Sequence, residues 1–192
     1  MELEFVTLFL NGGFIMRTLL MFILALGMFA GCAKRYELGM VEPRPFKIET
    51  LKSKKAMLFI SNKSLPDRFE NFDAGSDFRG LHAVVKNFFQ KKFQTTFASF
   101  VISQDDMGAT DTDILFYPAL SMSPTDDGPL AKNLVMNFGL TATDRSGKKI
   151  ANRNMEKKLN YASTTKAEIE FALGEIMDEV SEDILNDLSK VK

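Results

Sequence analysis

The sequence predicts an α+β domain in which an antiparallel sheet of about five strands carries two amphipathic helices on one face. Three observations predict this fold class. Two segments repeat apolar residues at helical spacing. Two other long segments, joined by a tight turn, alternate apolar and polar residues with the period of a strand. The elements follow one another in the order β-α-β-β-β-β-α, which favours hairpins covered by helices.

The first strand and the first helix are separated by a polar stretch. Residues 56–61 form a continuous apolar run, which suits a buried central strand. The residues that follow, up to residue 76, contain Pro66 and Gly75 and predict a loop. From Asp77 to Gln94 the spacing changes to steps of three and four, which predicts a helix facing the core. Its apolar stripe consists of Phe78, Leu81, Val84, Val85, Phe88, Phe89 and Phe93.

The remaining strands follow from alternation. Residues 97–104 and 114–122 predict two strands, and Pro118, which has no N–H to donate, places the latter at a sheet edge or a bulge. The segments on either side of residues 144–147 alternate in phase, and Gly147 can supply a positive φ, so they predict a hairpin. These two strands cover residues 134–142 and 148–161.

A capping box opens the last helix. The Thr165 hydroxyl and the Glu168 carboxylate are spaced so that each can accept a hydrogen bond from the backbone N–H of the other. Acidic residues come early in this helix and lysines late, in agreement with the helix dipole. Its apolar stripe consists of Ile169, Leu173, Ile176, Met177, Val180, Ile184 and Leu188.

Composition excludes several function classes. The formal net charge of −1 leaves no basic stripe for nucleic acid. One cysteine, Cys32, excludes an internal disulfide and a cysteine-based metal site, and a lone histidine, His82, argues against a histidine-based metal site and a Ser-His-Asp triad. Asp111 and Asp113 have the spacing of metal-binding acids, but the lack of a nucleotide-binding pattern around them favours a turn. We therefore expect no enzyme, no metal and no cofactor.

The N-terminus carries the most specific motif. Arg17 precedes an apolar run of 13 residues, Leu19 to Gly31, which is short of the ~20 residues that a membrane-spanning helix needs. Two small residues, Ala30 and Gly31, come directly before Cys32. A basic residue, a short apolar run and a small-residue cleavage site are the parts of an export signal. An uncleaved signal anchor and an apolar N-terminal helix of a cytosolic protein remain alternatives.

Residues 29–32, Phe-Ala-Gly-Cys, resemble a bacterial lipobox, with Phe29 in place of the usual leucine. The resemblance implies that the Cys32 thiol receives a diacylglyceryl group and that the signal is cleaved between Gly31 and Cys32. It also implies acylation of the new amino group, for example with palmitate, so that two or three chains anchor the protein stably. Ala33, where aspartate would favour the inner membrane, implies delivery to the outer membrane of an organism with two membranes.

These observations predict the domain organisation. We expect residues 1–31 to be the signal peptide, with Met16 as the true start because the residues before it include two acids and no base. Residues 32–54 are expected to form a lipidated tether, because prolines and scattered charges show no periodicity there. Residues 55–192 are expected to form a single periplasmic domain.

The element order and the hairpin resemble those of small periplasmic α/β lipoproteins. Examples are the YajG-like group, the auxiliary lipoproteins of transport systems and the lipoproteins of polysaccharide export. The resemblance implies a non-catalytic accessory module of the cell envelope. Such a module would dock to an envelope protein complex through an exposed apolar patch or a free sheet edge near Pro118. The alternative is a lipid or glycolipid carrier with an apolar cavity between sheet and helices, suggested by Phe88, Phe89, Phe93, Phe97 and Phe100.

Overall fold

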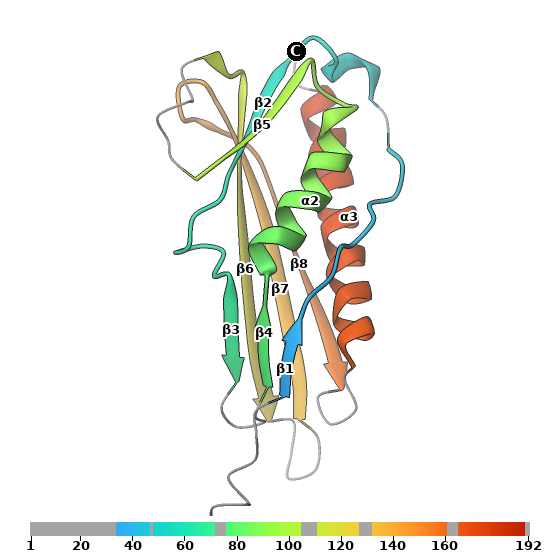
Figure 1. The fold of residues 1–192 in the computed structure, drawn as a ribbon. Coiled ribbons are helices and arrows are strands. Elements are labelled where there is room, and N and C mark those ends of the chain that lie inside the picture. The colour runs from blue at the N-terminus through green and yellow to red at the C-terminus, as the bar shows by residue number, and fades with distance from the viewer. Residues whose placement is uncertain are drawn as a thin grey trace, which may run out of the picture. The chain divides into compact units, whose positions relative to one another are not determined.

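A sheet of five strands and two helices make up most of the described structure. The structure, a computed structural model, describes residues 34–46, 48–71, 76–104, 111–126, 132–160 and 165–190. In chain order the elements are β2 (Lys55–Phe59), α2 (Leu81–Gln94), β5 (Ser99–Ser103), β6 (Ile114–Asp126), β7 (Lys132–Asp144), β8 (Lys149–Asn160) and α3 (Lys166–Lys190). In space the strands follow the order β5-β2-β6-β7-β8 (Figure 1). The predicted α+β class is confirmed, and these seven elements follow the predicted order β-α-β-β-β-β-α.

The sheet is mixed and not wholly antiparallel, which corrects the prediction. β2 pairs in parallel with both β5 and β6, whereas β6, β7 and β8 pair antiparallel. The reason is that α2 lies between β2 and β5 along the chain. A helical crossover brings the following strand back in the same direction, so the β-α-β part of the chain forms parallel pairs.

Pro118 was predicted at a sheet edge or a bulge, and it lies in β6, an interior strand, past the end of that strand's pairing with β2. β2 pairs with β6 only over residues 114–116. Beyond that point the loop after β2 takes over: the Ser64 carbonyl accepts from Leu120 N–H at 2.9 Å, and the Ser64 hydroxyl donates to the Pro118 carbonyl at 3.1 Å. Residues two apart in a strand direct their backbone N–H groups to the same side. Because the Leu120 N–H points to the loop, the Pro118 nitrogen does too, and the proline costs no hydrogen bond to β7.

A smaller sheet of three strands, in the order β1-β4-β3, was not predicted. Its strands are β1 (Lys34–Glu37), β3 (Arg68–Asn71) and β4 (Ser76–Arg79), each of which is too short to show a period in the sequence. One face joins the core: the Tyr36 and Phe78 rings stack 5.1 Å apart, and Phe69 lies 6.4 Å from Phe78.

The other face of the smaller sheet carries an acid beneath three arginines. Arg68 donates to Asp77 through Nε at 2.8 Å and Nη2 at 3.1 Å, and Arg79 donates through Nε at 2.9 Å. Arg35 Nε lies 3.7 Å from the same carboxylate. The hydrogen bonds from Arg68, helped by Arg79, outweigh desolvation and lower the pKa of Asp77 below its ordinary value.

α2 begins at Leu81, whereas the sequence pattern predicted a start at Asp77. Gly80 has a φ of 80°, a left-handed conformation that suits glycine and ends the preceding strand. Phe78, which was predicted on the helix stripe, therefore belongs to β4. The other six residues of the predicted stripe are buried. Lys92, which was not part of the prediction, is buried among them.

The predicted capping box at the start of α3 is present. Thr165 N–H donates to the Glu168 carboxylate at 2.7 Å, and Glu168 N–H donates to the Thr165 hydroxyl at 3.3 Å. The hydrogen bonds from Thr165 lower the pKa of Glu168. The predicted apolar stripe of α3 is buried along its whole length.

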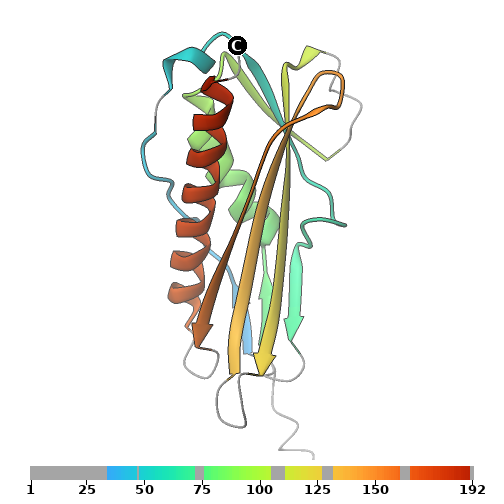
Figure 2. The ribbon, with the colours of Figure 1, turned by 180° about the vertical axis from the view of Figure 1, so that it is seen from behind.

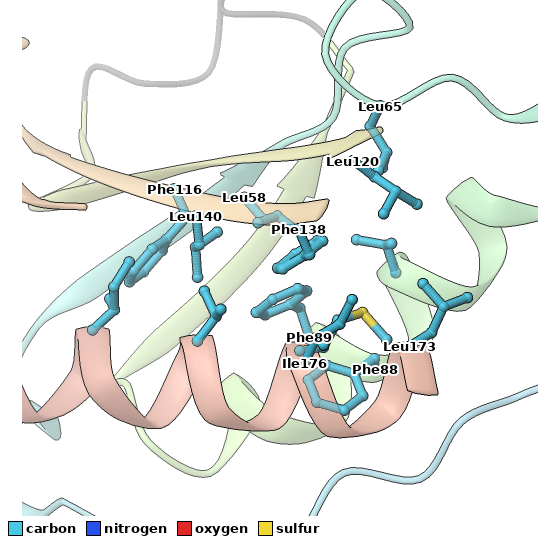
Figure 3. Close-up of a cluster of buried hydrophobic side chains, with 14 of the residues drawn as sticks. Leu58, Leu65, Phe88, Phe89, Phe116, Leu120, Phe138, Leu140, Leu173 and Ile176 are labelled. Carbon is cyan, nitrogen blue, oxygen red and sulfur yellow. The ribbon is translucent and has the colours of Figure 1, made fainter. Parts of the chain in front are cut away.

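Phenylalanine fills the space between the larger sheet and the helices. The Phe93 ring lies 4.8 Å from Phe116, 5.0 Å from Phe89 and 5.3 Å from Phe100. Figure 3 shows Phe116 and Phe138 from the sheet directed toward the layer that holds Phe89 from α2. The core is thus built from interlocking rings.

The other face of the larger sheet is open. Figure 2 shows β6 and β7 from this side with no helix in front of them. Asn152 and Asn154 of β8 are exposed there, opposite Thr141 and Gly139 of β7. Polar and small residues are what a solvated sheet face requires, so the two helices cover one face only, as predicted.

Candidate functional site

The residues after β1 run along α3 instead of leaving the domain as a tether (Figure 1). We call residues 38–46 the N-terminal segment. Gly39 N–H donates to the Glu170 carboxylate of α3. Residues 35–192 form one compact unit. The expected tether, residues 32–54, is therefore part of the domain from residue 35 onward, because specific contacts hold it there.

Val41 packs onto α3 where the helix has no side chain. Val41 is buried, and a Cβ on Gly174 would lie 2.7 Å from its Cγ1 atom. Carbon atoms do not approach so closely without displacement. Gly174 therefore allows the N-terminal segment to lie directly against the helix backbone.

A buried ion cluster joins the N-terminal segment to both helices. Lys92 Nζ of α2 lies 2.7 Å from Asp178 and 2.8 Å from Glu182 of α3, and it donates to the Arg44 carbonyl at 3.0 Å. Asp178 also accepts from the Arg44 backbone N–H at 3.1 Å and from its Nε at 3.2 Å. The Lys92 and Asp178 side chains are 1% and 5% exposed. Buried charges need such partners, so each of the three elements depends on the others.

Beside this cluster lies a groove of about 400 Å³ between the N-terminal segment and α3. Met40 and Phe171 line it, with 71% and 67% of their surface exposed. In the described part of the chain the large apolar residues that are exposed are these two and Val101. We call this feature the Phe171 groove. Its other lining residues are Val41, Glu42, Arg44, Glu170, Gly174, Glu175 and Asp178.

The lining of the Phe171 groove contains four acids and one base. Lys157 pairs with one of these acids, Glu175, and its Nζ lies 5.8 Å from the centre of the Phe171 ring. Glu179 and Asp183 continue the exposed surface of α3 beyond Glu175, at steps of four residues. The other acids of the lining are also paired, Glu42 with Lys91, Glu170 with Lys166, and Asp178 with Lys92 and Arg44, so ion pairs border the exposed ring.

The lipidation and cleavage sites predicted at Cys32 and Gly31 lie outside the described residues, and both stay predictions. Neither of the helices that the structure describes combines the length and the hydrophobicity needed to cross a membrane.

His82 takes part in local structure. Its Nε2 lies 2.5 Å from the Leu65 carbonyl oxygen, and its backbone N–H donates to the Asp67 carboxylate at 2.9 Å. The Asp67 side chain thereby satisfies one of the free N–H groups at the start of α2. His82, Asp67 and Lys86 line a second groove, of about 600 Å³.

Asp111 and Asp113, considered above as metal-binding acids, are both held by one lysine. Lys55 Nζ donates to Asp111 at 2.5 Å, and Lys55 N–H donates to Asp113 at 2.9 Å. The bond from Lys55 lowers the pKa of Asp111. Within the described residues, no group of three or more His, Cys, Asp or Glu side chains is arranged to hold a metal ion.

The sequence contained signals for residues that its analysis missed. Lys92 occupies a position on the apolar stripe of α2, which predicts a buried cation and therefore a buried acid elsewhere. Phe171 lies off the apolar stripe of α3, which predicts an exposed ring. Met40 has no comparable signal, because its neighbours show no periodicity.

Comparison with known proteins shows a shared fold. No family model matches the sequence, and no curated protein matches it. Protein XCC0632 from Xanthomonas campestris, of the DUF330 family, has a similar structure, with 10% identity and a TM-score of 0.53 over 82% of this chain and 96% of that chain. A minor lipoprotein from Acinetobacter baumannii is 15% identical over 72% of this chain and 92% of that one, with a TM-score of 0.36. Lipoprotein GNA1162 from Neisseria meningitidis is 11% identical over 67% of this chain and 99% of that one, with a TM-score of 0.32. The likeness to XCC0632 shows that the two proteins share a fold.

Proposed function

We propose that the protein is a lipid-anchored, non-catalytic interaction module of the cell envelope. The anchor would be the acylated Cys32, on the periplasmic face of the outer membrane, as the lipobox and Ala33 predict. The observation that carries the proposal is the Phe171 groove, where two exposed apolar side chains lie side by side on a rigid helix and the segment locked to it. Exposed apolar surface of this kind marks interaction sites.

The chemistry of the groove indicates its occupant. Phe171 and Met40 offer contact area to an apolar side chain, whereas the acids of the lining are already paired with bases of this chain. We therefore propose that the partner is an envelope protein that presents an apolar side chain to Phe171 and Met40. The lipid anchor would hold both proteins at the same membrane and raise their effective concentration.

The arrangement of the core favours this function over a lipid carrier. A carrier needs an apolar cavity between sheet and helices. The residues that suggested one instead pack against one another, with Phe88, Phe89 and Phe93 fully buried. A non-catalytic role is supported by His82, Asp111 and Asp113, whose hydrogen bonds to neighbouring residues give each of them a structural role.

Photo-crosslinking in living cells tests the groove. A photoreactive residue at position 167, on the exposed surface of α3 one turn before Phe171, should form an adduct with one protein. The same residue at position 154, on the open face of the sheet, should not. Phe171→Ser should abolish the adduct, and the matched change Val101→Ser, which also removes an exposed apolar side chain, should leave it intact.

The outcomes separate the parts of the proposal. An adduct that survives Phe171→Ser, or that forms equally from position 154, would contradict a role for the groove. Metabolic labelling with a clickable palmitate tests the anchor independently, because the wild type should carry the label and Cys32→Ser should not.

A further inference from the structure

β5 is an edge strand of the larger sheet, at the end of the domain that holds the C-terminus (Figure 1). In the described part of the chain it pairs with β2 and with no other strand. An edge strand presents backbone N–H and carbonyl groups to its free side, and proteins usually protect it with charged side chains, proline or a β-bulge. β5 has none of these: its sequence is Ser-Phe-Val-Ile-Ser, and its pairing with β2 runs without interruption from end to end.

The other edge strands are protected by charge. β8 carries five charged residues among twelve, and the edges of the smaller sheet, β1 and β3, carry three and two among four. A short length does not explain the difference, because β1 and β3 are shorter than β5 and are still charged. No residue from Phe93 to Gln104 is charged. The contrast indicates that the edge of β5 is suited to pairing with another strand.

The backbone groups on the free side of β5 are those of Phe100 and Ile102. The Ser103 carbonyl accepts from the N–H of Ile60, directly after β2, at 2.9 Å, so Ser103 faces β2. Neighbouring residues in a strand direct their backbone groups to opposite sides, so Ile102 and Phe100 direct theirs to the free side. The N–H of Ala98, which precedes the strand, donates to the β2 side of the sheet.

The Val101 side chain is exposed between these two residues. Phe100 and Ile102 pack against the core, whereas Val101 points to the open face of the sheet and is 52% exposed. β5 is nearly symmetric about Val101, because Ser-Phe-Val-Ile-Ser reads the same in both directions apart from the exchange of two large apolar residues. Such a strand is complementary to a second copy of itself in antiparallel orientation.

We propose that β5 pairs antiparallel with β5 of a second copy of this chain, about a twofold axis at Val101. Phe100 of each copy then lies opposite Ile102 of the other, and the two exchange both of their backbone hydrogen bonds. Val101 lies opposite its own copy in the closer, non-hydrogen-bonded kind of pair, so the two exposed side chains cover each other. The sheets of the two copies become continuous. This pairing goes beyond the proposed function and requires neither the lipid anchor nor the Phe171 groove.

Disulfide crosslinking of the full-length protein in cell membranes tests the register. Val101→Cys should give a covalent dimer on oxidation with copper phenanthroline, because opposed Cα atoms about 4.5 Å apart suit a disulfide. Ser99→Cys is the matched control: this residue is also exposed and lies on the same face of β5, but its copy would lie about 14 Å away along the strands. The unchanged protein controls for crosslinks through Cys32.

Two differently tagged copies, expressed together, identify the partner. The covalent dimer of Val101→Cys should contain both tags. A crosslink to a different protein, no crosslink from Val101→Cys, or an equal yield from Ser99→Cys would overturn the proposal.

A charge at the edge tests the strand pairing itself. Sedimentation of the purified full-length protein in detergent should show a dimer. Val101→Lys should raise its dissociation constant about tenfold or more, because two lysines would face each other across the axis. Val101→Thr, which keeps a β-branched side chain, should preserve the dimer, and so should Asn154→Lys, which adds the same charge to β8. A monomeric wild type, or equal dissociation constants for the wild type and Val101→Lys, would overturn the proposal.

Discussion

Lys92 Nζ lies 2.7 Å from an Asp178 carboxylate oxygen, and this pair joins α2 to α3 in the interior of the domain. Buried ion pairs contribute little net stability when intact, yet the loss of one partner leaves an uncompensated charge. Because the Arg44 backbone N–H binds the same carboxylate, the N-terminal segment is held in place only when α2 and α3 are packed together.

The first prediction concerns Asp178→Ala. We expect it to lower the free energy of unfolding by about 3 kcal/mol, since Lys92 would keep only Glu182 as an acidic partner. Urea denaturation measures the change. Glu179→Ala removes the neighbouring, exposed acid and should have an effect within about 0.5 kcal/mol. Equal effects of the two substitutions would refute the role assigned to the cluster.

A second prediction uses the close approach of Val41 to Gly174. Gly174→Ala should destabilise the protein by about 1–3 kcal/mol, because the new methyl group would overlap with Val41 Cγ1. Adding Val41→Ala should recover part of that loss, so the two changes should not be additive. A double-mutant cycle by urea denaturation checks this, and strict additivity would show that the two residues do not press on each other.

The third prediction is a pH dependence. The arginines lower the pKa of Asp77 below its ordinary value of 3.8. Its contribution to stability is therefore fully present above that value and is lost as the pH falls through the lowered pKa. Asp77→Asn should make stability less dependent on pH in this acidic range. Asp111, Asp144 and Glu168 also have lowered pKa values, so the quantity to measure is the difference between wild type and variant. Identical pH profiles would contradict the prediction.

A fourth prediction separates two kinds of phenylalanine. Phe93→Ala should cost about 3–5 kcal/mol, because its ring contacts four others in the core. Phe171→Ala should change stability by less than about 0.5 kcal/mol, because this ring is mostly exposed. Thermal unfolding monitored by circular dichroism distinguishes the two. A large loss for Phe171→Ala would mean that this side chain serves the fold and not a partner.

Periodic segments were predictable because their own pattern specifies them. The stripes of α2 and α3, the capping box at Thr165 and the hairpin with Gly147 depend on residues close in sequence, and each was predicted in place except for Phe78, which belongs to β4. The smaller sheet was missed because strands of four residues carry no readable alternation. The parallel pairing of β2 was missed because the alternation of a strand does not reveal the direction of its neighbours.

The Phe171 groove could not be assembled from the sequence. Its two walls lie about 130 positions apart, and the contact depends on Gly174 and on the buried pair that binds Arg44. Asp178 shows the difficulty, since a buried acid on a helix rich in exposed acids looks the same in the sequence as its neighbours. The readable clues were Lys92, which interrupts an otherwise apolar stripe, and Phe171, which lies off the stripe of α3.

The path of the N-terminal segment has a mechanical consequence. The contacts at Gly39, Val41 and Arg44 meet α3 at Glu170, Gly174 and Asp178 in the same order, so segment and helix run side by side in one direction. A pull on the chain from its N-terminal side, such as the proposed lipid anchor would exert, would act along this row and strain all of its contacts at once in shear. Contacts strained together resist far more force than contacts that open one after another. The packing of the N-terminal segment on α3 therefore resists tension along the axis of α3 most strongly.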